Sequence, residues 1–221
     1  TGRAAAWLAG WFYPSYKYRH ALAGMSPSGY VSPTAVIHHK SLTLGKHVFV
    51  GDGVTIFSHG AGESVVLCDE VVINKDTIIE LGHGGSLTIG ARTTIQPRCQ
   101  FSAYKGPISI GKDVQIAPNC AFYPYNHGMS PDKPMKQQPL VSKGGIHIGD
   151  DVWVGYGVIM LDGVHIGKGA VMIRIDKKQT WLIIVLAIAL VVCIGIPWLI
   201  SGYWLRLLTV VFMFVIVAKC V

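Results

Sequence analysis

Residues 148–170 read IGDDVWVGYGVIMLDGVHIGKGA and decide the fold. The stretch divides into four consecutive hexads that open on Ile148, Val154, Met160 and Ile166, and the fifth residue of each hexad is small or β-branched. A period of six matches neither the 3.6-residue repeat of a helix nor the simple alternation of an isolated strand. It indicates a short strand followed by a corner that contains glycine, because glycine takes a positive φ without steric cost.

Aliphatic openers of the same kind recur toward the N-terminus, at Leu44, Leu67, Ile89, Ile110 and Ile148. The gaps between them are 23, 22, 21 and 38 residues, whereas the step from 148 to 166 is 18 residues. Three hexads make one triangular turn, and stacked turns place each opener over its equivalent in a continuous apolar column. We therefore predict an all-β fold, a hexapeptide-repeat parallel β-helix over residues 30–172. Extra residues are expected at a corner.

The longest excursion from the repeat lies between Tyr123 and Gly145, YPYNHGMSPDKPMKQQPLVSKGG. It has no aliphatic period, so we expect it to project from the rod rather than to pack. Long loops on a rigid scaffold commonly carry function. Two residues of the rod itself, Cys99 and Cys120, fall on the small inward position, where a cysteine packs as a small hydrophobe.

The composition divides the chain into unequal parts. It is 51% hydrophobic with a mean hydropathy of +0.43, and the excess lies near the C-terminus, in an uncharged run from Trp181 to Ile200 and a shorter apolar run from 205 to 218 that includes Arg206. Twenty apolar residues suffice for a helix that crosses a bilayer. We predict a helical cap over 1–29, with an aromatic helix within 3–24 that closes the rod or lies on a membrane surface. A transmembrane-like helical tail is predicted over 173–221.

Charge and cysteine usage exclude several classes of function. The net charge is +7, but residues 1–171 hold fourteen Lys or Arg against eleven Asp or Glu, so the body carries no strong basic patch. Nucleic acid is therefore not an expected partner. Five cysteines without CxxC spacing argue against disulfides and zinc clusters. The start of the chain shows no secretory leader, so we expect a cytoplasmic body that is membrane-associated if the tail is authentic.

Residues 126–172 read NHGMSPDKPMKQQPLVSKGGIHIGDDVWVGYGVIMLDGVHIGKGAVM, and this segment resembles the hexapeptide acyltransferases. That left-handed β-helix family includes galactoside, serine, xenobiotic and polysaccharide O-acetyltransferases, and the sugar or capsule O-acetyltransferase branch is the most similar. The resemblance covers about residues 30–172. It implies a left-handed winding, acetyl-CoA as co-substrate, no metal, and a sugar or small-molecule acceptor that is acetylated on a hydroxyl or amine. It also implies a homotrimer with its sites between subunits.

The resemblance further implies roles for single residues. His127 corresponds to the general base, and a neutral imidazole is suited to take a proton from an acceptor hydroxyl near pH 7. The implied acceptor-binding residues are Tyr125, Asn126 and Trp153, and the implied coenzyme A-binding residues are Lys143, Gly155 and Lys168. Two alternatives stay open: Trp153 packs on a neighbouring subunit, and the two lysines are simply exposed. The other eight histidines are interpreted as surface residues.

The match to the acyltransferases stops after Met172, and the segment that follows resembles the start of branched-chain amino-acid transport permeases. Two interpretations compete. The chain is a membrane-anchored acetyltransferase, or it joins two unrelated coding regions and truncates the catalytic domain, which is the interpretation we favour. A gamma-class carbonic anhydrase, with three histidines on a metal, and an inactive or structural solenoid remain as alternative functions.

Overall fold

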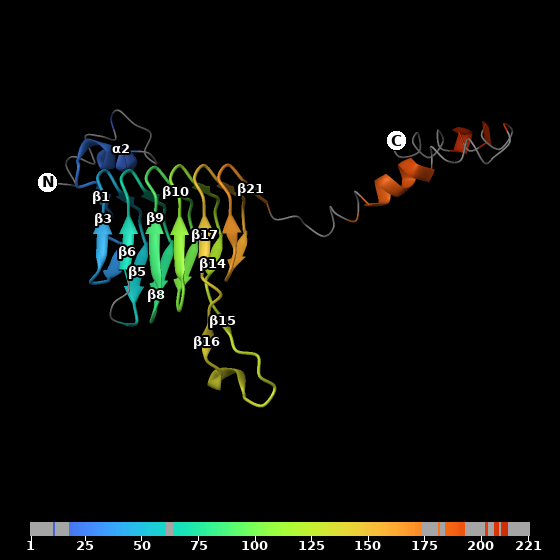
Figure 1. Cartoon of the computed structure of the whole chain (residues 1–221). Helices are drawn as coiled ribbons and strands as arrows, with labels where there is room; N and C mark the ends of the chain where they lie inside the picture. Colours follow the sequence, from blue (N-terminus) through green and yellow to red (C-terminus); the bar gives the residue numbers. More distant parts are fainter. Residues whose placement is uncertain are drawn as a thin grey trace. The chain divides into compact units, whose positions relative to one another are not determined.

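The computed structural model describes residues 11, 18–60, 64–173, 181, 184–192, 202, 206–207 and 209–211. The chain divides into two compact units, Thr1–Arg174 and Ile175–Val221. The described residues of the first unit form helix α2 (Tyr18–Met25) and then a parallel β-solenoid, from which a hairpin projects (Figure 1). The predicted parallel β-helix is thus confirmed, while its left-handed winding stays a prediction.

Six successive turns of the solenoid each supply one strand to each of three parallel sheets. The first sheet consists of β1 (Tyr30–Val31), β4 (Phe49–Val50), β7 (Val72–Ile73), β10 (Thr94–Ile95), β13 (Gln115–Ile116), β18 (Trp153–Val154) and, after the sixth turn, β21 (Val171–Met172). The second sheet consists of β2 (Val36–His38), β5 (Thr55–Ser58), β8 (Ile78–Leu81), β11 (Gln100–Ala103), β14 (Ala121–Tyr123) and β19 (Ile159–Leu161). The third sheet consists of β3 (Leu42–Leu44), β6 (Ser64–Leu67), β9 (Ser86–Ile89), β12 (Pro107–Ile110), β17 (Ile146–Ile148) and β20 (His165–Ile166).

The predicted column of openers is present in the third sheet. Each opener pairs in register with the next one, in the order Leu44, Leu67, Ile89, Ile110, Ile148 and Ile166. The four inner members are at most 4% exposed, whereas Leu44 in the first turn is 36% exposed because no turn precedes it. Full burial of one such side chain stabilises the fold by about 1.5–3 kcal/mol, so the stacked column is a main source of stability.

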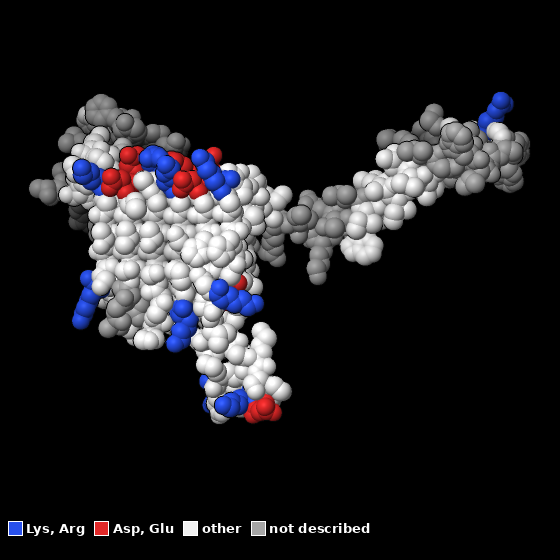
Figure 2. Space-filling view, viewed as in Figure 1, with Lys and Arg blue, Asp and Glu red and all other residues white. Residues whose placement is uncertain are grey.

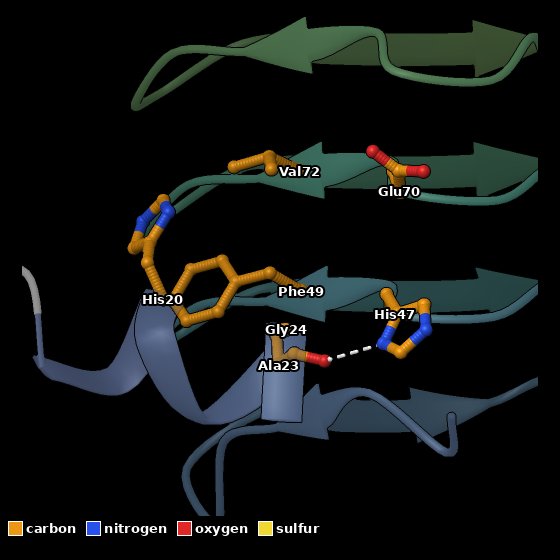
Figure 3. Close-up of a pocket in the computed structure, with 7 residues that line it drawn as sticks. All are labelled: His20, Ala23, Gly24, His47, Phe49, Glu70 and Val72. Atoms are coloured by element: carbon orange, nitrogen blue, oxygen red, sulfur yellow. Dashed lines mark hydrogen bonds between the residues drawn. The ribbon is translucent and has the colours of Figure 1, made fainter. Parts of the chain in front are cut away.

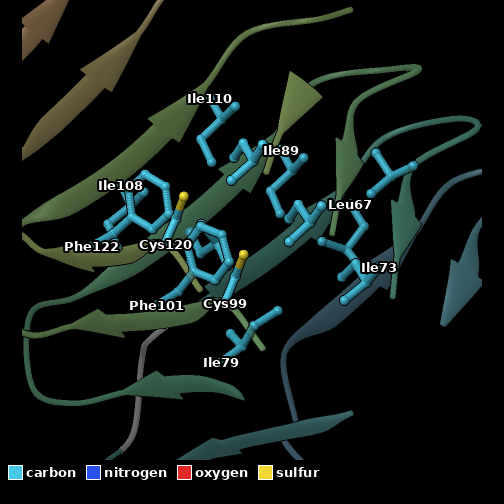
Figure 4. Packing of buried hydrophobic residues seen from close by; sticks show 14 of the residues in the cluster. Leu67, Ile73, Ile79, Ile89, Cys99, Phe101, Ile108, Ile110, Cys120 and Phe122 are labelled. Atoms are coloured by element: carbon cyan, nitrogen blue, oxygen red, sulfur yellow. The ribbon is translucent and has the colours of Figure 1, made fainter. Parts of the chain in front are cut away.

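Aromatic rings and cysteines complete the centre of the core (Figure 4). Phe101 and Phe122 stack with ring centroids 4.5 Å apart and planes that differ by 1°. Cys99 and Cys120 are each 1% exposed, which confirms their prediction as core residues, and the Cys99 thiol donates to the Ala117 carbonyl at 3.3 Å. The hydrogen bond with Cys120, together with burial, raises the pKa of Cys99 above the usual thiol range.

Two of the three corners have a fixed length of four residues in every turn. These are the first corner, which joins the first sheet to the second, and the third corner, which joins the third sheet to the first. In eleven of these twelve corners the third residue has a positive φ, and the residue type there is often Asp, Asn or Gly. Short polar residues and glycine tolerate that left-handed conformation best.

The expected role of the glycines that follow the openers needs a correction. Gly90, Gly111 and Gly149 do not have positive φ. They are needed because the turns approach closely: a Cβ at Gly111 would lie 2.6 Å from the backbone carbon of Gly149 in the next turn. A missing side chain at the first position of the corner, rather than an unusual backbone angle, therefore allows the turns to stack.

Only the second corner, which joins the second sheet to the third, varies in length. Its segments are residues 39–41, 59–63, 82–85, 104–106, 124–145 and 162–164. The extra residues predicted from the unequal gaps therefore lie in this corner and in the strands that flank it. In the fourth turn, for example, the corner has three residues as in the sixth, but β11 and β12 have four residues each where β19 and β20 have three and two. The long segment of the fifth turn contains β15 (Asn126–His127), the 3₁₀ helix η1 (Met135–Gln137) and β16 (Leu140–Val141).

The described part of the predicted N-terminal helix is α2, which packs on the outer face of the first sheet. His20 stacks on Phe49 with ring centroids 3.9 Å apart, and Ala23 is buried. The rest of the predicted segment, apart from residue 11, lies outside the described residues. Of the predicted tail span, residues 181 and 184–192 are described and helical. Among the described residues, no helix reaches the length and apolarity that crossing a bilayer requires.

Candidate active site

The segment between β14 and β17 leaves the solenoid as an antiparallel hairpin (Figure 1). Asn126 lies opposite Val141 and His127 opposite Leu140 in the β15–β16 pair. Beyond the pair, the loop is ordered by the buried amide of Gln138, whose Nε2 donates to the Ser130 and Lys133 carbonyls at 2.9 Å. The prediction that this segment projects is confirmed, and its tip is stabilised by its own hydrogen bonds.

A carboxylate of the sixth turn anchors the base of the hairpin. Asp162 accepts hydrogen bonds from the Ser142 hydroxyl at 2.8 Å, the Lys143 backbone N–H at 2.6 Å and the Gly145 backbone N–H at 3.1 Å, and the Asn126 amide lies at 3.5 Å. Burial alone would raise the pKa of Asp162, but the hydrogen bonds outweigh it and lower this pKa. Sequence reasoning missed Asp162, since its partners lie 17 to 36 residues away and nothing local marks them.

His127 occupies the first strand of this hairpin and its side chain is exposed. In the described part of the chain no side chain hydrogen-bonds to its imidazole. The backbone beside it is fixed, because the Gly128 N–H donates to the Pro139 carbonyl at 2.9 Å and Asn126 reaches Asp162. The fold therefore presents an accessible imidazole on an anchored support.

Only some of the predicted site residues come together in one chain. Tyr125, Asn126, His127 and Lys143 all belong to the hairpin or its base at the second corner. Trp153 is 51% exposed on the outer face of the first sheet, in register between Gln115 and Val171. It thus lies on another side of the three-sided solenoid.

The two remaining predicted residues also lie away from the hairpin. Gly155 belongs to the first corner of the sixth turn, and its backbone N–H donates to the Met172 carbonyl at 2.6 Å. A Cβ at Gly155 would lie 2.9 Å from that oxygen, so close stacking accounts for the glycine. Lys168 is exposed at the third corner. A single chain therefore divides the predicted site into separate groups.

Next to the hairpin base lies a second polar group that sequence reasoning missed. Glu80, in β8, accepts hydrogen bonds from the Tyr104 hydroxyl at 2.9 Å and the Ser102 hydroxyl at 3.2 Å, and its Oε1 lies 3.1 Å from Nε2 of His59. The Tyr104 ring in turn packs against Tyr125 with centroids 5.4 Å apart. These residues come from turns two to five. Their proximity can be predicted from the sequence only when the register of the turns is known.

Charged side chains gather along one edge of the solenoid (Figure 2). At the third corner, Arg92 donates to both carboxylate oxygens of Asp113 in the next turn, at 2.6 and 2.7 Å. The hydrogen bonds from Arg92 lower the pKa of Asp113. Opposite charges alternate from turn to turn here, which neutralises the edge rather than forming a basic patch.

A pocket of about 350 Å³ lies between α2 and the first sheet (Figure 3). Its lining residues are His20, Ala23, Gly24, His47, Phe49, Glu70 and Val72. The His47 imidazole is already bonded to the Ala23 carbonyl at 3.2 Å, and none of the predicted site residues lines this pocket. As regards metals, no group of three or more His, Cys, Asp or Glu within the described ranges is placed to hold an ion.

The register and the three sheets identify the architecture. The fold is a hexapeptide-repeat β-solenoid. No protein-family model and no curated protein matches the sequence.

Several solved structures are similar to the chain, and two of them are acetyltransferases. The polySia-specific acetyltransferase NeuO is 20% identical, with a TM-score of 0.39, over 64% of this chain and 70% of that one. A variant of the GDP-perosamine N-acetyltransferase from Caulobacter crescentus, solved with CoA and GDP-perosamine, is 18% identical, with a TM-score of 0.28, over 64% of this chain and 50% of that one.

Proposed function

We propose that this chain is an acetyl-CoA-dependent acetyltransferase that moves an acetyl group to a hydroxyl, or an amine, of a sugar or small-molecule acceptor. The observation that supports it most is His127, an exposed imidazole on a hairpin that Asp162 fastens to a hexapeptide-repeat solenoid. The resemblance of residues 126–172 to the sugar O-acetyltransferases points to the same residue.

In the proposed reaction, Nε2 or Nδ1 of His127 takes the proton of the acceptor hydroxyl while the oxygen attacks the thioester carbonyl carbon. The carbon–sulfur bond then breaks, and the coenzyme A sulfur leaves as a thiol with the proton that the imidazolium returns. A general base of this kind contributes about 10²–10⁴-fold to the rate. Asp162 would act as a positioning residue, since it bonds to the hairpin and not to the imidazole.

We further propose a homotrimer in which the site is shared between copies. The hairpin with Tyr125, Asn126 and His127 lies at the second corner, whereas Trp153 lies on the outer face of the first sheet. A neighbouring copy that turns its first sheet toward this hairpin would reunite the two groups. A three-sided rod suits closed three-fold association of this kind. Lys143, Gly155 and Lys168 are the residues proposed to hold coenzyme A.

The proposal is tested by following the release of the coenzyme A thiol from acetyl-CoA with a panel of sugar acceptors. We expect His127→Ala to lower the rate of the wild-type chain by about 10²–10⁴-fold. His165→Ala is the matched control, because His165 is also exposed but lies on the outer face of the third sheet, stacked on His147. Equal rates in wild type and His127→Ala would eliminate His127 as the base.

A further inference from the structure

Aromatic side chains from several turns line the second sheet and its corner beside the hairpin. The ring centroids of Phe57 and His59 in turn two lie 5.2 Å apart, and the His59 centroid lies 6.2 Å from that of Tyr104 in turn four. Tyr104 contacts Tyr125 of turn five at 5.4 Å, and Tyr125 contacts Tyr123 at 6.3 Å. We call these five residues the aromatic shelf. It spans three strand spacings, on the order of 14 Å, and ends two residues before His127.

The central ring of the shelf is held in a fixed position. The Tyr104 ring lies directly against Gly82 of the preceding turn, where an added Cβ would overlap the ring. Its hydroxyl donates to Glu80, which also accepts from the buried Ser102. An aromatic ring that is fixed before binding loses little entropy when a ligand stacks on it. The contacts of Tyr104 are therefore those expected of a preorganised binding surface.

The carboxylate of Glu80 retains capacity for one more hydrogen bond. A carboxylate offers about four acceptor positions. Oε1 is occupied by Tyr104 and His59, and Oε2 by Ser102, so one position on Oε2 stays available within the described residues. Glu80 is partly exposed, and a ligand hydroxyl that donates to it would form a charge-assisted hydrogen bond.

The charge of the second sheet restricts the ligand class. None of its six strands contains Lys or Arg, and Glu80 is the single carboxylate among their residues. Among the described residues, the charged or titratable side chains of this corner in turns two to six include Asp162, which bonds to the hairpin base, and five exposed residues, His59, His83, Lys105, His127 and Lys143. An anionic ligand would meet Glu80 without a cation on the sheet to balance it. A ligand rich in hydroxyls, with apolar ring faces and no negative charge, fits better.

We propose that the aromatic shelf binds successive units of a neutral glycan chain, whose end or near-end unit then lies at His127. The proposal rests on the proposed acetyl transfer for its last clause alone, because binding to the shelf does not require catalysis. Sugar rings would stack on Tyr125 and Tyr104, and a hydroxyl would donate to Glu80. The acceptor is then an oligosaccharide or polysaccharide rather than a single sugar.

Binding is tested with the full chain on immobilised oligosaccharides, from single sugars to hexasaccharides. The neutral probes are gluco-, galacto-, manno- and N-acetylglucosamine series, and the anionic probes are sialic and uronic acid chains of the same lengths. We expect at least one neutral series to bind more tightly as it lengthens. Tyr104→Ala should weaken that binding about tenfold, whereas Tyr104→Phe, which keeps the ring, should weaken it less. Tyr156→Ala, at an exposed tyrosine of the first corner, is the matched control and should have no effect.

Three results would overturn the proposal: no neutral series binds, anionic chains bind better, or Tyr104→Ala and Tyr125→Ala bind as wild type does. A change of oligomeric state in Tyr104→Ala, measured by light scattering, would also overturn it, because the shelf would then be a contact between copies. Thermal unfolding of each variant checks folding. If glycans bind through the shelf but His127→Ala transfers acetyl groups as fast as wild type does, the proposed role of His127 is refuted, whereas glycan binding by the aromatic shelf is supported.

Discussion

We expect two variants that are inactive alone, His127→Ala and Trp153→Ala, to restore activity when they are mixed. The expectation follows from the placement of the two side chains, one on the hairpin at the second corner and the other on the outer face of the first sheet. If the site is shared between adjacent copies, a mixed assembly contains interfaces at which both side chains are intact. Each variant by itself contains none.

The size of the recovery follows from random assembly. A site is intact only where the copy that supplies the hairpin carries Trp153→Ala and the adjacent copy carries His127→Ala. With equal amounts of both variants, this holds for about one site in four, so the mixture should reach about a quarter of wild-type activity. A site built within one copy would give no recovery, because every copy would lack one of the two residues.

The assay is the release of the coenzyme A thiol after the two variants have been unfolded and refolded together. Two different affinity tags, purified in sequence, confirm that mixed assemblies have formed. The matched control mixes wild type with the double variant: a shared site predicts about a quarter of wild-type activity and an undivided site about half. Doubly tagged assemblies no more active than the separate variants would refute the shared site, and full activity of Trp153→Ala alone would remove this residue from it.

Three further predictions concern the scaffold. Gly111→Ala should lower the free energy of unfolding by about 1–3 kcal/mol in denaturant titrations, because its Cβ would meet the next turn, whereas Gly167→Ala, at the equivalent position with open space around it, should change it by less than about 0.5 kcal/mol. Phe101→Ala should cost about 3–5 kcal/mol in the same titration, since it removes a fully buried ring stacked on Phe122, and a smaller loss would mean that the core closes over the cavity. The pKa of Asp162 lies below its usual 3.8, so its hold on the hairpin should be complete near neutral pH and be lost as the pH falls through that lowered pKa. The protection of the Lys143 N–H, measured as its exchange rate relative to the intrinsic rate at each pH, should therefore fall only in strong acid, and Asp162→Asn should abolish that pH dependence of the protection.

The repeat made the scaffold predictable to the level of register. The openers from Leu44 to Ile166 pair with one another as the six-residue repeat predicts, because each turn of a solenoid places its hexads directly over the equivalent hexads of the preceding turn. The expectation that corner glycines take a positive φ is confirmed at Gly53, Gly157 and Gly169, but it is wrong for the glycines that follow the openers, where close approach of the turns is the cause. The sequence of a single hexad does not show how closely the backbones of adjacent turns approach. A positive φ at the third residue of a corner does not require glycine either, since Arg92 and Glu70 occupy that position.

The candidate site was predictable only where it is local in sequence. His127 stands out because it lies in the one long insertion, and the structure places it on that insertion. Asp162, Glu80 and Tyr104 could not be found in this way, because their partners come from other turns and the lengths of the second-corner segments decide which side chains meet. The separation of Trp153 from His127 likewise depends on which sheet each hexad enters.

The restriction of variable corner length to the second corner has a consequence for engineering. The first and third corners admit four residues in every turn, so an insertion there would displace a stacked backbone. The second corner already accommodates segments of three to twenty-two residues without change to the register of the strands that flank it. Foreign peptides grafted between β11 and β12, or between β19 and β20, should therefore be displayed in a row at defined spacing while the rod beneath them keeps its melting temperature.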